Sequence, residues 1–373
     1  MPPTRGRAVG WRRSGRAVGW RRTWPTAAAY GAAAWSLTYA GLGLYWTFGG
    51  AGFPFGPVGD PAANLSVLGS ADRGVVAPAI TAIGITGAAI ALAMVRNGGT
   101  GSVRLALLAF GWLLAVALAV VIPDFRVLVI VAYAPILLLG APFGWPADAR
   151  FSEAIPWPVL NQGICVAGGL LWAAATLGYQ RRTRGACGHC GRTDAGGGWS
   201  KVGALLRGRW AVGVALAIPL AYAATRWLWA LGVPLGISEA FYREGRAVGL
   251  WRIGAALATL AAAGSLLTLG LVRPWGEVFA RWIPWAGGRR VPRALVLVPA
   301  GLVAVIVTSA GLMFVRMTIA GTFRLGDHAI TLDENFGALA PELLWPVWGG
   351  ALAVAVLAYR YRTRGRCEVC GRA

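Results

Sequence analysis

Two short cysteine motifs carry the clearest chemistry in the sequence. Each motif places two cysteines three positions apart and follows them with Gly and Arg, and the four cysteines are Cys187, Cys190, Cys367 and Cys370. Two thiolates on one tight turn are half of a four-cysteine zinc site, and Gly after the second Cys can adopt the left-handed conformation that turns backbone amides toward sulfur. The pair of motifs therefore predicts one structural zinc ion (Zn) held by four thiolates.

Two other interpretations of these cysteines stay open. They could form a thiol redox pair, or they could be inert or paired differently, although disulfides are rare in the cytoplasm, where we expect both motifs. Flanking arginines would lower the thiol pKa under the metal and the redox interpretations alike; they are Arg182, Arg184, Arg362 and Arg364. The fifth cysteine, Cys165, lies within an apolar run and is interpreted as a small packing residue.

The composition indicates what kind of protein carries these motifs. Of the 373 residues, 57% are hydrophobic and only 13% are charged, whereas soluble globular chains have about 25% charged residues. The apolar residues form continuous runs of about 20 residues, the length that crosses a bilayer. The sequence therefore predicts an all-α, polytopic membrane helix bundle, and it excludes a β-barrel, a secreted disulfide scaffold, a coiled coil and a disordered chain.

We expect eight transmembrane helices, at about 27–48, 75–95, 104–122, 158–179, 210–231, 253–272, 294–315 and 344–360. With the N-terminus in the cytoplasm, 26 of the 35 Lys and Arg residues but only 3 of the 14 Asp and Glu residues lie on the cytoplasmic side. This asymmetry satisfies the positive-inside rule. It predicts a multi-pass protein of the plasma membrane with both termini cytoplasmic, and it explains the net charge of +21 without a nucleic-acid partner.

A ninth apolar run, residues 127–143, is interrupted by Pro135. As a full span it would move the Arg-rich segment 181–184 to the outer face, so we interpret residues 123–157 as an outer hairpin, with a ninth span as the alternative. Irregular backbone at membrane depth needs protein or a water-filled cavity around it. The hairpin interpretation thus indicates a cavity on the outer side.

The chain also contains an internal duplication. Residues 172–192 and 352–372 are identical at 12 of 21 positions, and the segment 52–56 resembles 232–236 at the same offset. Each unit holds four predicted helices, and an even number makes the units parallel about an axis along the membrane normal. The predicted fold is two tandem parallel four-helix repeats, a 4+4 pseudo-twofold bundle. Its predicted parts are an N-terminal arm (1–26), the first repeat (27–180), a cytoplasmic linker with the first cysteine motif (181–209), the second repeat (210–363) and the C-terminal motif (364–373).

The N-terminal arm repeats the sequence GRAVGWRR at 6–13 and 15–22. Arg interleaved with Trp suits an anionic lipid surface, at roughly 1 kcal/mol per charge, and would also suit a nucleic-acid backbone. The simplest interpretation is that the arm only enforces orientation. If it contacts anionic lipid headgroups of the bilayer, the residues that do so are Arg12, Arg13, Arg21 and Arg22.

Few other residues indicate a ligand. Arg226 lies near the outer end of the fifth predicted span, where we expect it to snorkel to the interface, with contact to an anionic ligand as the alternative. Asp327 and His328, with Asp333 and Glu334, could form a metal site or an acid–base pair in an outer loop, although a solvated acidic loop is simpler. The sequence contains no phosphate-binding glycine loop, nucleophile elbow or HExxH signature.

Three classes of function stay open at this point. One is a permease or channel, one is a membrane scaffold or sensor that binds a cytoplasmic protein partner through the zinc clamp and Arg-rich face, and one is an enzyme with an outer-face site. A polar path between the halves would favour transport, and a dry, tightly packed contact would favour the scaffold. Convergence of Asp327, His328 and Arg residues in an outer pocket would favour the enzyme.

Deletion of residues 1–22 tests the simplest interpretation of the arm. Because the later cytoplasmic segments also carry Arg, the shortened chain is expected to reach the membrane at the level of the full chain, in the same orientation. Membrane fractionation with a C-terminal topology reporter measures this. A large loss of insertion, or of binding to anionic vesicles, would assign the arm a role beyond orientation.

Overall fold

The structure is a computed structural model that describes residues 15–96, 99–140, 155–193, 200–325 and 328–372. Helices dominate these residues, beside one short antiparallel hairpin of β1 (Arg324–Leu325) and β2 (His328–Ala329). The first half of the chain holds α1 (Gly15–Thr47), α2 (Gly56–Gly59), η1 (Ala63–Leu65), α3 (Arg73–Arg96), α4 (Gly101–Val116), η2 (Ala117–Val121), α5 (Phe125–Gly140) and α7 (Trp157–Thr183). The second half holds α8 (Lys201–Ala230), α9 (Glu239–Ala247), α10 (Leu250–Thr268), η4 (Leu269–Leu271), η5 (Pro274–Gly276), α11 (Arg293–Ala320), α12 (Phe336–Leu343) and α13 (Trp345–Thr363).

Seven helical segments among the described residues are long and apolar enough to cross a membrane. They are α3, α4 with η2, α7, α8, α10 with η4, α11, and α12 with α13. The multi-pass helical membrane character predicted from the sequence is therefore confirmed. The predicted first span is also helical, in α1, but it is not among the seven, because Tyr, Trp, Gly and Ser dilute the hydropathy of this helix.

The start of α1 differs from the prediction. The helix begins at Gly15 rather than at 27, so the second copy of the arm repeat is the first part of a helix that continues through Pro25. Arg21 and Arg22 lie on α1, and Arg12 and Arg13 lie outside the described residues. Helical propensity explains the difference, because Arg, Ala and Trp tolerate a helix outside the apolar core.

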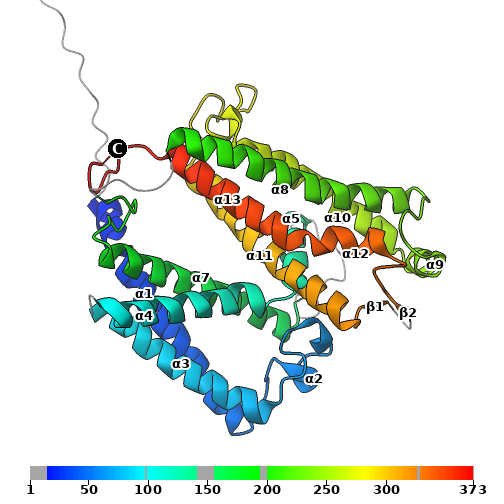
Figure 1. Ribbon diagram of the computed structural model, residues 1–373, viewed down its shortest axis with the longest axis horizontal. Helices are drawn as coiled ribbons and strands as arrows, with labels where there is room; N and C mark the ends of the chain where they lie inside the picture. Colours follow the sequence, from blue (N-terminus) through cyan, green and yellow to red (C-terminus); the bar gives the residue numbers. More distant parts are fainter. Residues whose placement is uncertain (1–14, 97–98, 141–154, 194–199, 326–327, 373) are drawn as a thin grey trace, which may run out of the picture.

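The helices of each half pack in the same order. In the first half α1 packs against α3 and α7, and α7 packs against α4; in the second half α8 packs against α10 and α13, and α13 packs against α11 (Figure 1). Small residues allow these close approaches. A side chain at Gly84 would meet the Ser36 carbonyl oxygen at 2.7 Å, and one at Gly349 would meet the Ala304 carbonyl oxygen at 2.7 Å.

The two halves meet where α11 packs against α5 and η2. Val127, Val159 and Ile306 form a buried apolar cluster there, and the rings of Phe125 and Phe314 lie 6.2 Å apart. These residues make this part of the contact apolar.

Two polar side chains of α11 also join the halves. Ser309 Oγ donates to the Pro123 carbonyl oxygen at 2.8 Å. Arg316 donates to the carbonyl oxygens of Leu65 and Ser66 at the end of η1 in the first half. These bonds satisfy carbonyl groups of the first half at the edge of the apolar contact.

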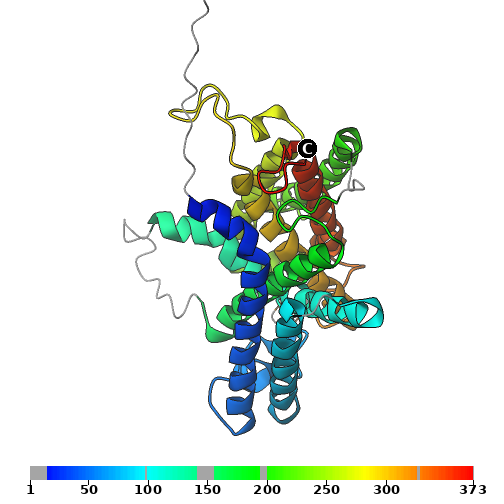
Figure 2. The same ribbon diagram turned by 90° about the vertical axis from the view of Figure 1, so that its left-hand side faces the viewer.

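The segment predicted as an outer hairpin begins with one continuous helix, α5. Figure 2 shows this teal helix projecting to the side of the bundle, across the direction of the long helices. With 16 residues it is shorter than the helices counted as spans. The return arm falls on residues 141–154, outside the described part of the chain, so the hairpin stays a prediction.

A buried polar cluster surrounds the start of α5. The Asp124 side chain is 1% exposed and accepts a hydrogen bond from Gln162 Nε2 at 2.7 Å. Arg126 donates to both Asp124 and Asp60, at 2.6 Å in each pair. Burial alone would raise the pKa of Asp60, but hydrogen bonding by Arg126 holds this pKa below its usual value. Asp124 thus bonds to the start of α7, and Arg126 links it to Asp60 in an earlier loop.

The prediction that Arg226 snorkels to the interface is also wrong. Its side chain is buried and forms an ion pair with Glu342 of α12. It also donates to the carbonyl oxygens of Gly337 and Ala338, while its guanidinium lies 4.3 Å from the centre of the Tyr222 ring. These bonds use its donors inside the protein, so the structure gives no support to an anionic ligand at this residue.

Removal of one partner of this buried pair tests its role. Glu342→Leu leaves a buried guanidinium without its counter-charge, so we expect a loss of about 3–5 kcal/mol in the free energy of unfolding, and Arg226→Met with Glu342→Leu should recover most of it. Unfolding of the detergent-solubilised protein measures both. Glu239→Leu is the control, because the Glu239–Arg243 pair is exposed and its loss costs at most about 1 kcal/mol. A small effect of Glu342→Leu would show that the pair is solvated.

Candidate metal centre

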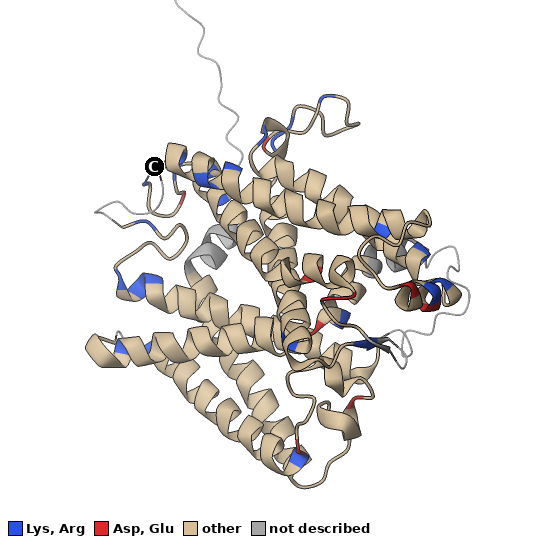
Figure 3. Cartoon of the chain, turned by 45° about the vertical axis from the view of Figure 1, so that its right-hand side comes forward, with Lys and Arg blue, Asp and Glu red and all other residues tan. Residues whose placement is uncertain are grey.

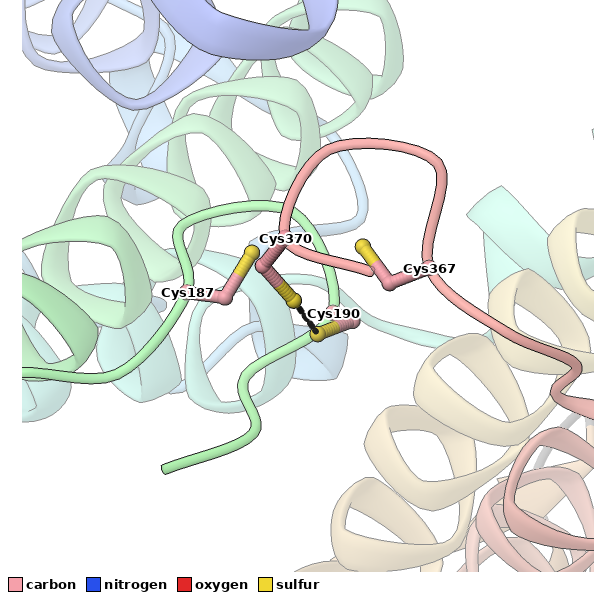
Figure 4. A group of neighbouring side chains, drawn as sticks. All are labelled: Cys187, Cys190, Cys367 and Cys370. Carbon is pink, nitrogen blue, oxygen red and sulfur yellow. Dashed lines mark hydrogen bonds between the residues drawn. The ribbon is translucent and has the colours of Figure 1, made fainter. Parts of the chain in front are cut away.

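The four predicted cysteines come together in the structure. The four Sγ atoms all lie within 4.8 Å of one another, and Cys190 Sγ lies 3.6 Å from Cys370 Sγ. Figure 4 shows the loops that carry the two motifs facing each other with the sulfur atoms between them. A tetrahedral ion with metal–sulfur bonds of about 2.3 Å separates its ligands by about 3.8 Å. The cysteines are therefore positioned to bind one metal ion.

Both loops have the same internal hydrogen bonds. Cys187 N–H donates to the Arg192 carbonyl oxygen and Cys367 N–H donates to the Arg372 carbonyl oxygen, each at 2.9 Å. The N–H groups of Gly191 and Gly371 donate to the carbonyl oxygen of the first cysteine of their own loop. Gly191 has a φ of 76° and Gly371 a φ of 72°. This left-handed backbone favours glycine, which is why the Gly after each second Cys matters.

Two arginines join the loops to each other. Arg192 Nη1 donates to the Arg372 carbonyl oxygen at 3.0 Å, and Arg372 Nη1 donates to the Arg192 carbonyl oxygen at 2.9 Å. Arg192 Nη1 also donates to the Gly365 carbonyl oxygen at 3.0 Å. The exchange is reciprocal, so the loops are held face to face by bonds that do not involve sulfur.

The helices that end before the loops fix their positions. Arg181 near the end of α7 donates to the carbonyl oxygens of Gly188 and His189 in the first loop. Arg182 donates to the carbonyl oxygens of Met94 and Val95 at the end of α3. In the second half, Arg362 binds Glu277 and the Leu271 carbonyl oxygen in the same way. Arg181 thus anchors the first loop to α7, while Arg182 and Arg362 fix the ends of α7 and α13 within their own halves.

The thiols differ in acidity. Burial raises the pKa of the Cys190 thiol to about 11. Burial alone would also raise the pKa of the Cys367 thiol, but the backbone N–H groups of Cys370 and Val369 and the neighbouring thiols lower it to about 7. Of the four flanking arginines, Arg364 interacts electrostatically with Cys190, whereas Arg182 and Arg362 bind carbonyl or carboxylate oxygens elsewhere. All four thiols are free of disulfides.

The chain matches no known family model, no curated protein and no solved structure. The function is therefore inferred from the geometry of the protein itself.

The other predicted site residues are not gathered at this centre. Arg226 lies in α8 and is paired with Glu342. Asp327 lies outside the described residues, and His328 is described only as backbone in β2. The outer acid–base site suggested by the sequence therefore stays a prediction. Cys165 is buried beside Tyr39, with 3.8 Å between the Tyr39 hydroxyl and Cys165 Sγ, which fits the expected packing role.

Sequence reasoning missed the buried polar side chains that pair at the start of the fourth helix of each half. Gln162 binds Asp124, and Glu342 binds Arg226. Gln162 and Glu342 are separated by the same offset as the two cysteine motifs. That offset could have identified these residues from the sequence, because it aligns polar Gln162 with acidic Glu342 inside two largely apolar helices.

A substitution at Gly371 tests the left-handed turn of the second loop. An added Cβ there has no neighbour within 4 Å, so only backbone strain opposes Gly371→Ala. A left-handed non-glycine residue costs roughly 1–2 kcal/mol, so metal affinity should fall roughly tenfold. Competition with a chelator measures the affinity. Gly350→Ala, whose Cβ also meets nothing within 4 Å, should leave it unchanged; equal affinity of both variants would contradict the role of the turn.

Proposed function

We propose that this chain is a membrane scaffold or sensor built from two four-helix repeats, which one structural zinc ion clamps together on the cytoplasmic face. The observation that carries the proposal is the convergence of four sulfur atoms within 4.8 Å from two loops that lie in different halves of the sequence. Each half contributes two of the ligands. A metal at this point therefore ties the end of α7 to the end of α13.

The ligand set favours zinc. Four thiolates in two motifs of this spacing are typical of structural zinc sites, whereas Ca²⁺ and Mg²⁺ prefer oxygen ligands. A closed four-thiolate site has no open position for water or substrate, so the role we assign to the ion is structural. Metal binding then contributes directly to the stability of the contact that it closes.

Local backbone geometry supports the duplication. The segments 52–56 and 232–236 each begin and end with glycine in the left-handed region, with φ of 78° and 68° in the first and 99° and 69° in the second. The helices of the two halves also share one packing order, and the cysteine loops share one hydrogen-bond pattern. A repeated ancestral unit accounts for all three features.

The contact between the halves favours a scaffold over a permease. A permease of two parallel halves would be expected to carry a polar path between them. Among the described residues, the contact of α11 with α5 and η2 contains the apolar cluster of Val127, Val159 and Ile306. The polar side chains of α11 that join the halves, Ser309 and Arg316, donate to backbone carbonyl oxygens of the first half. A packed apolar contact suits two halves that stay together and present one surface.

The distribution of charge supports a cytoplasmic position for the clamp. Figure 3 shows that basic residues gather at the end of the bundle that carries the cysteine loops, while most acidic residues lie toward the other end. Basic residues beside transmembrane helices favour the cytoplasmic side. The same basic face, together with the zinc clamp, is the surface we assign to a cytoplasmic protein partner.

Elemental analysis tests the zinc assignment. The purified full chain should contain about one zinc per molecule, the stoichiometry of a single closed site. Cys187→Ser and Cys370→Ser should each abolish binding, because each removes one ligand from a different half. Cys165→Ala is the matched control and should keep the metal, since Cys165 lies in a helix away from the cluster. Metal-free protein with a Cys187–Cys190 disulfide under reducing conditions would favour the redox interpretation instead.

A further inference from the structure

Two buried hydrogen-bond donors in the first half have no acceptor among the described residues. They are the Tyr179 hydroxyl and Arg104 Nη2, both of which are covered from solvent. The Tyr179 side chain is 3% exposed. Buried donors without a partner are rare in folded proteins because their desolvation is uncompensated. Two such groups close together indicate a missing acceptor.

Both donors lie beside the turn between α3 and α4. A Cβ built on Gly99 would lie 2.1 Å from the Tyr179 hydroxyl and 3.5 Å from Arg104 Cα. Arg104 Nε donates to Thr183 Oγ1 at 2.9 Å, and Thr183 Oγ1 binds the Tyr179 carbonyl oxygen at 3.0 Å. One turn of α7 therefore holds both groups at the start of α4.

The start of α4 adds a second attraction for an anion. Thr100 precedes the helix without capping it through its side chain, and the first turn contains no acidic residue. The free amides and the helix dipole at such an N-terminus favour negative charge. Arg182 adds a further cation, because its guanidinium lies 5.6 Å from the centre of the Tyr179 ring.

Tyr179 and Arg182 border a cavity of about 220 Å³. Its other walls come from α1, α7, the end of α3 and the first cysteine loop. In Figure 1 this end of α3 and α4 lies on the same side of the bundle as the cysteine loops. The cavity thus lies at the end of the bundle that carries the cysteine loops.

The second half satisfies its equivalent tyrosine internally. Tyr359 occupies the position of Tyr179 in the second repeat, and its hydroxyl donates to the Gly276 carbonyl oxygen at 2.7 Å. Among the described residues, the same tyrosine therefore has an acceptor in one half and lacks one in the other.

We infer that Tyr179, Arg104 and the start of α4 bind a phosphate group. The phosphate oxygens accept the Tyr179 hydroxyl, Arg104 Nη2 and the free amides of α4, and Arg182 contributes charge. A phosphate can come from the headgroup of an anionic phospholipid or from a soluble phosphate. Neither source depends on zinc at the cysteine cluster, so the site can fail or succeed independently of the clamp.

Thermal unfolding of the purified full chain in a phosphate-free detergent tests the site. One arm adds phosphatidylglycerol, with diacylglycerol as the lipid that lacks phosphate, and the other arm adds sodium phosphate, with sodium chloride as the salt control. We expect stabilisation by phosphatidylglycerol alone, which identifies a lipid headgroup, or by both compounds, which identifies a general phosphate site. Stabilisation by sodium phosphate alone would assign a soluble ligand.

Three variants make the test specific. Tyr179→Phe and Arg104→Gln should raise the phosphate concentration needed for stabilisation roughly tenfold, as expected for loss of one hydrogen bond to a charged group. Tyr359→Phe is the control and should respond like the unaltered chain. Without added phosphate, Tyr179→Phe should be as stable as the unaltered chain, because its hydroxyl binds no described residue. Absence of any stabilisation, or equal responses of Tyr179→Phe and the unaltered chain, would overturn the proposal.

Discussion

The approach of four thiols from distant parts of the chain constrains the position of one half of the protein against the other. Thiolates at such distances repel one another, so the cluster is stable only as protonated thiols or around a cation that neutralises the charge. A divalent ion with soft ligands meets that requirement at the end of α7 and the end of α13. The reciprocal arginine bonds between Arg192 and Arg372 place the loops for this ion but do not replace it.

The remaining contact between the halves lies where α11 meets α5 and η2, and it depends on different forces. Apolar packing there is supported by a few polar bonds, such as that from Ser309 to the Pro123 carbonyl oxygen. Within each half, a polar side chain near the start of the fourth helix holds a buried charged residue. Gln162 holds Asp124 and Glu342 holds Arg226, so the two halves hold side chains of opposite charge at corresponding helix starts.

The sequence predicts the helices well, because an apolar run of sufficient length has few alternatives in a bilayer. It also predicts the cysteine cluster, because identical spacing at a constant offset implies equivalent positions. It does not predict the partner of Arg226, because the sequence of α12 is typical of a loop between spans. The ion pair depends on tertiary packing, which the sequence pattern does not show. The burial of Asp124 cannot be predicted for the same reason. The start of α1 at Gly15 cannot be predicted for a different reason, because the charged and aromatic residues there are equally typical of an arm outside the bilayer.

X-ray absorption at the zinc edge tests the bridging metal most directly. Purified full chain should give a single shell of four sulfur atoms at about 2.3 Å, and Cys187→Ser and Cys370→Ser should each remove the zinc signal because each loop supplies two of the four ligands. A shell with nitrogen or oxygen ligands in the unaltered chain, or a shell that survives loss of either loop, would contradict a metal shared between the halves.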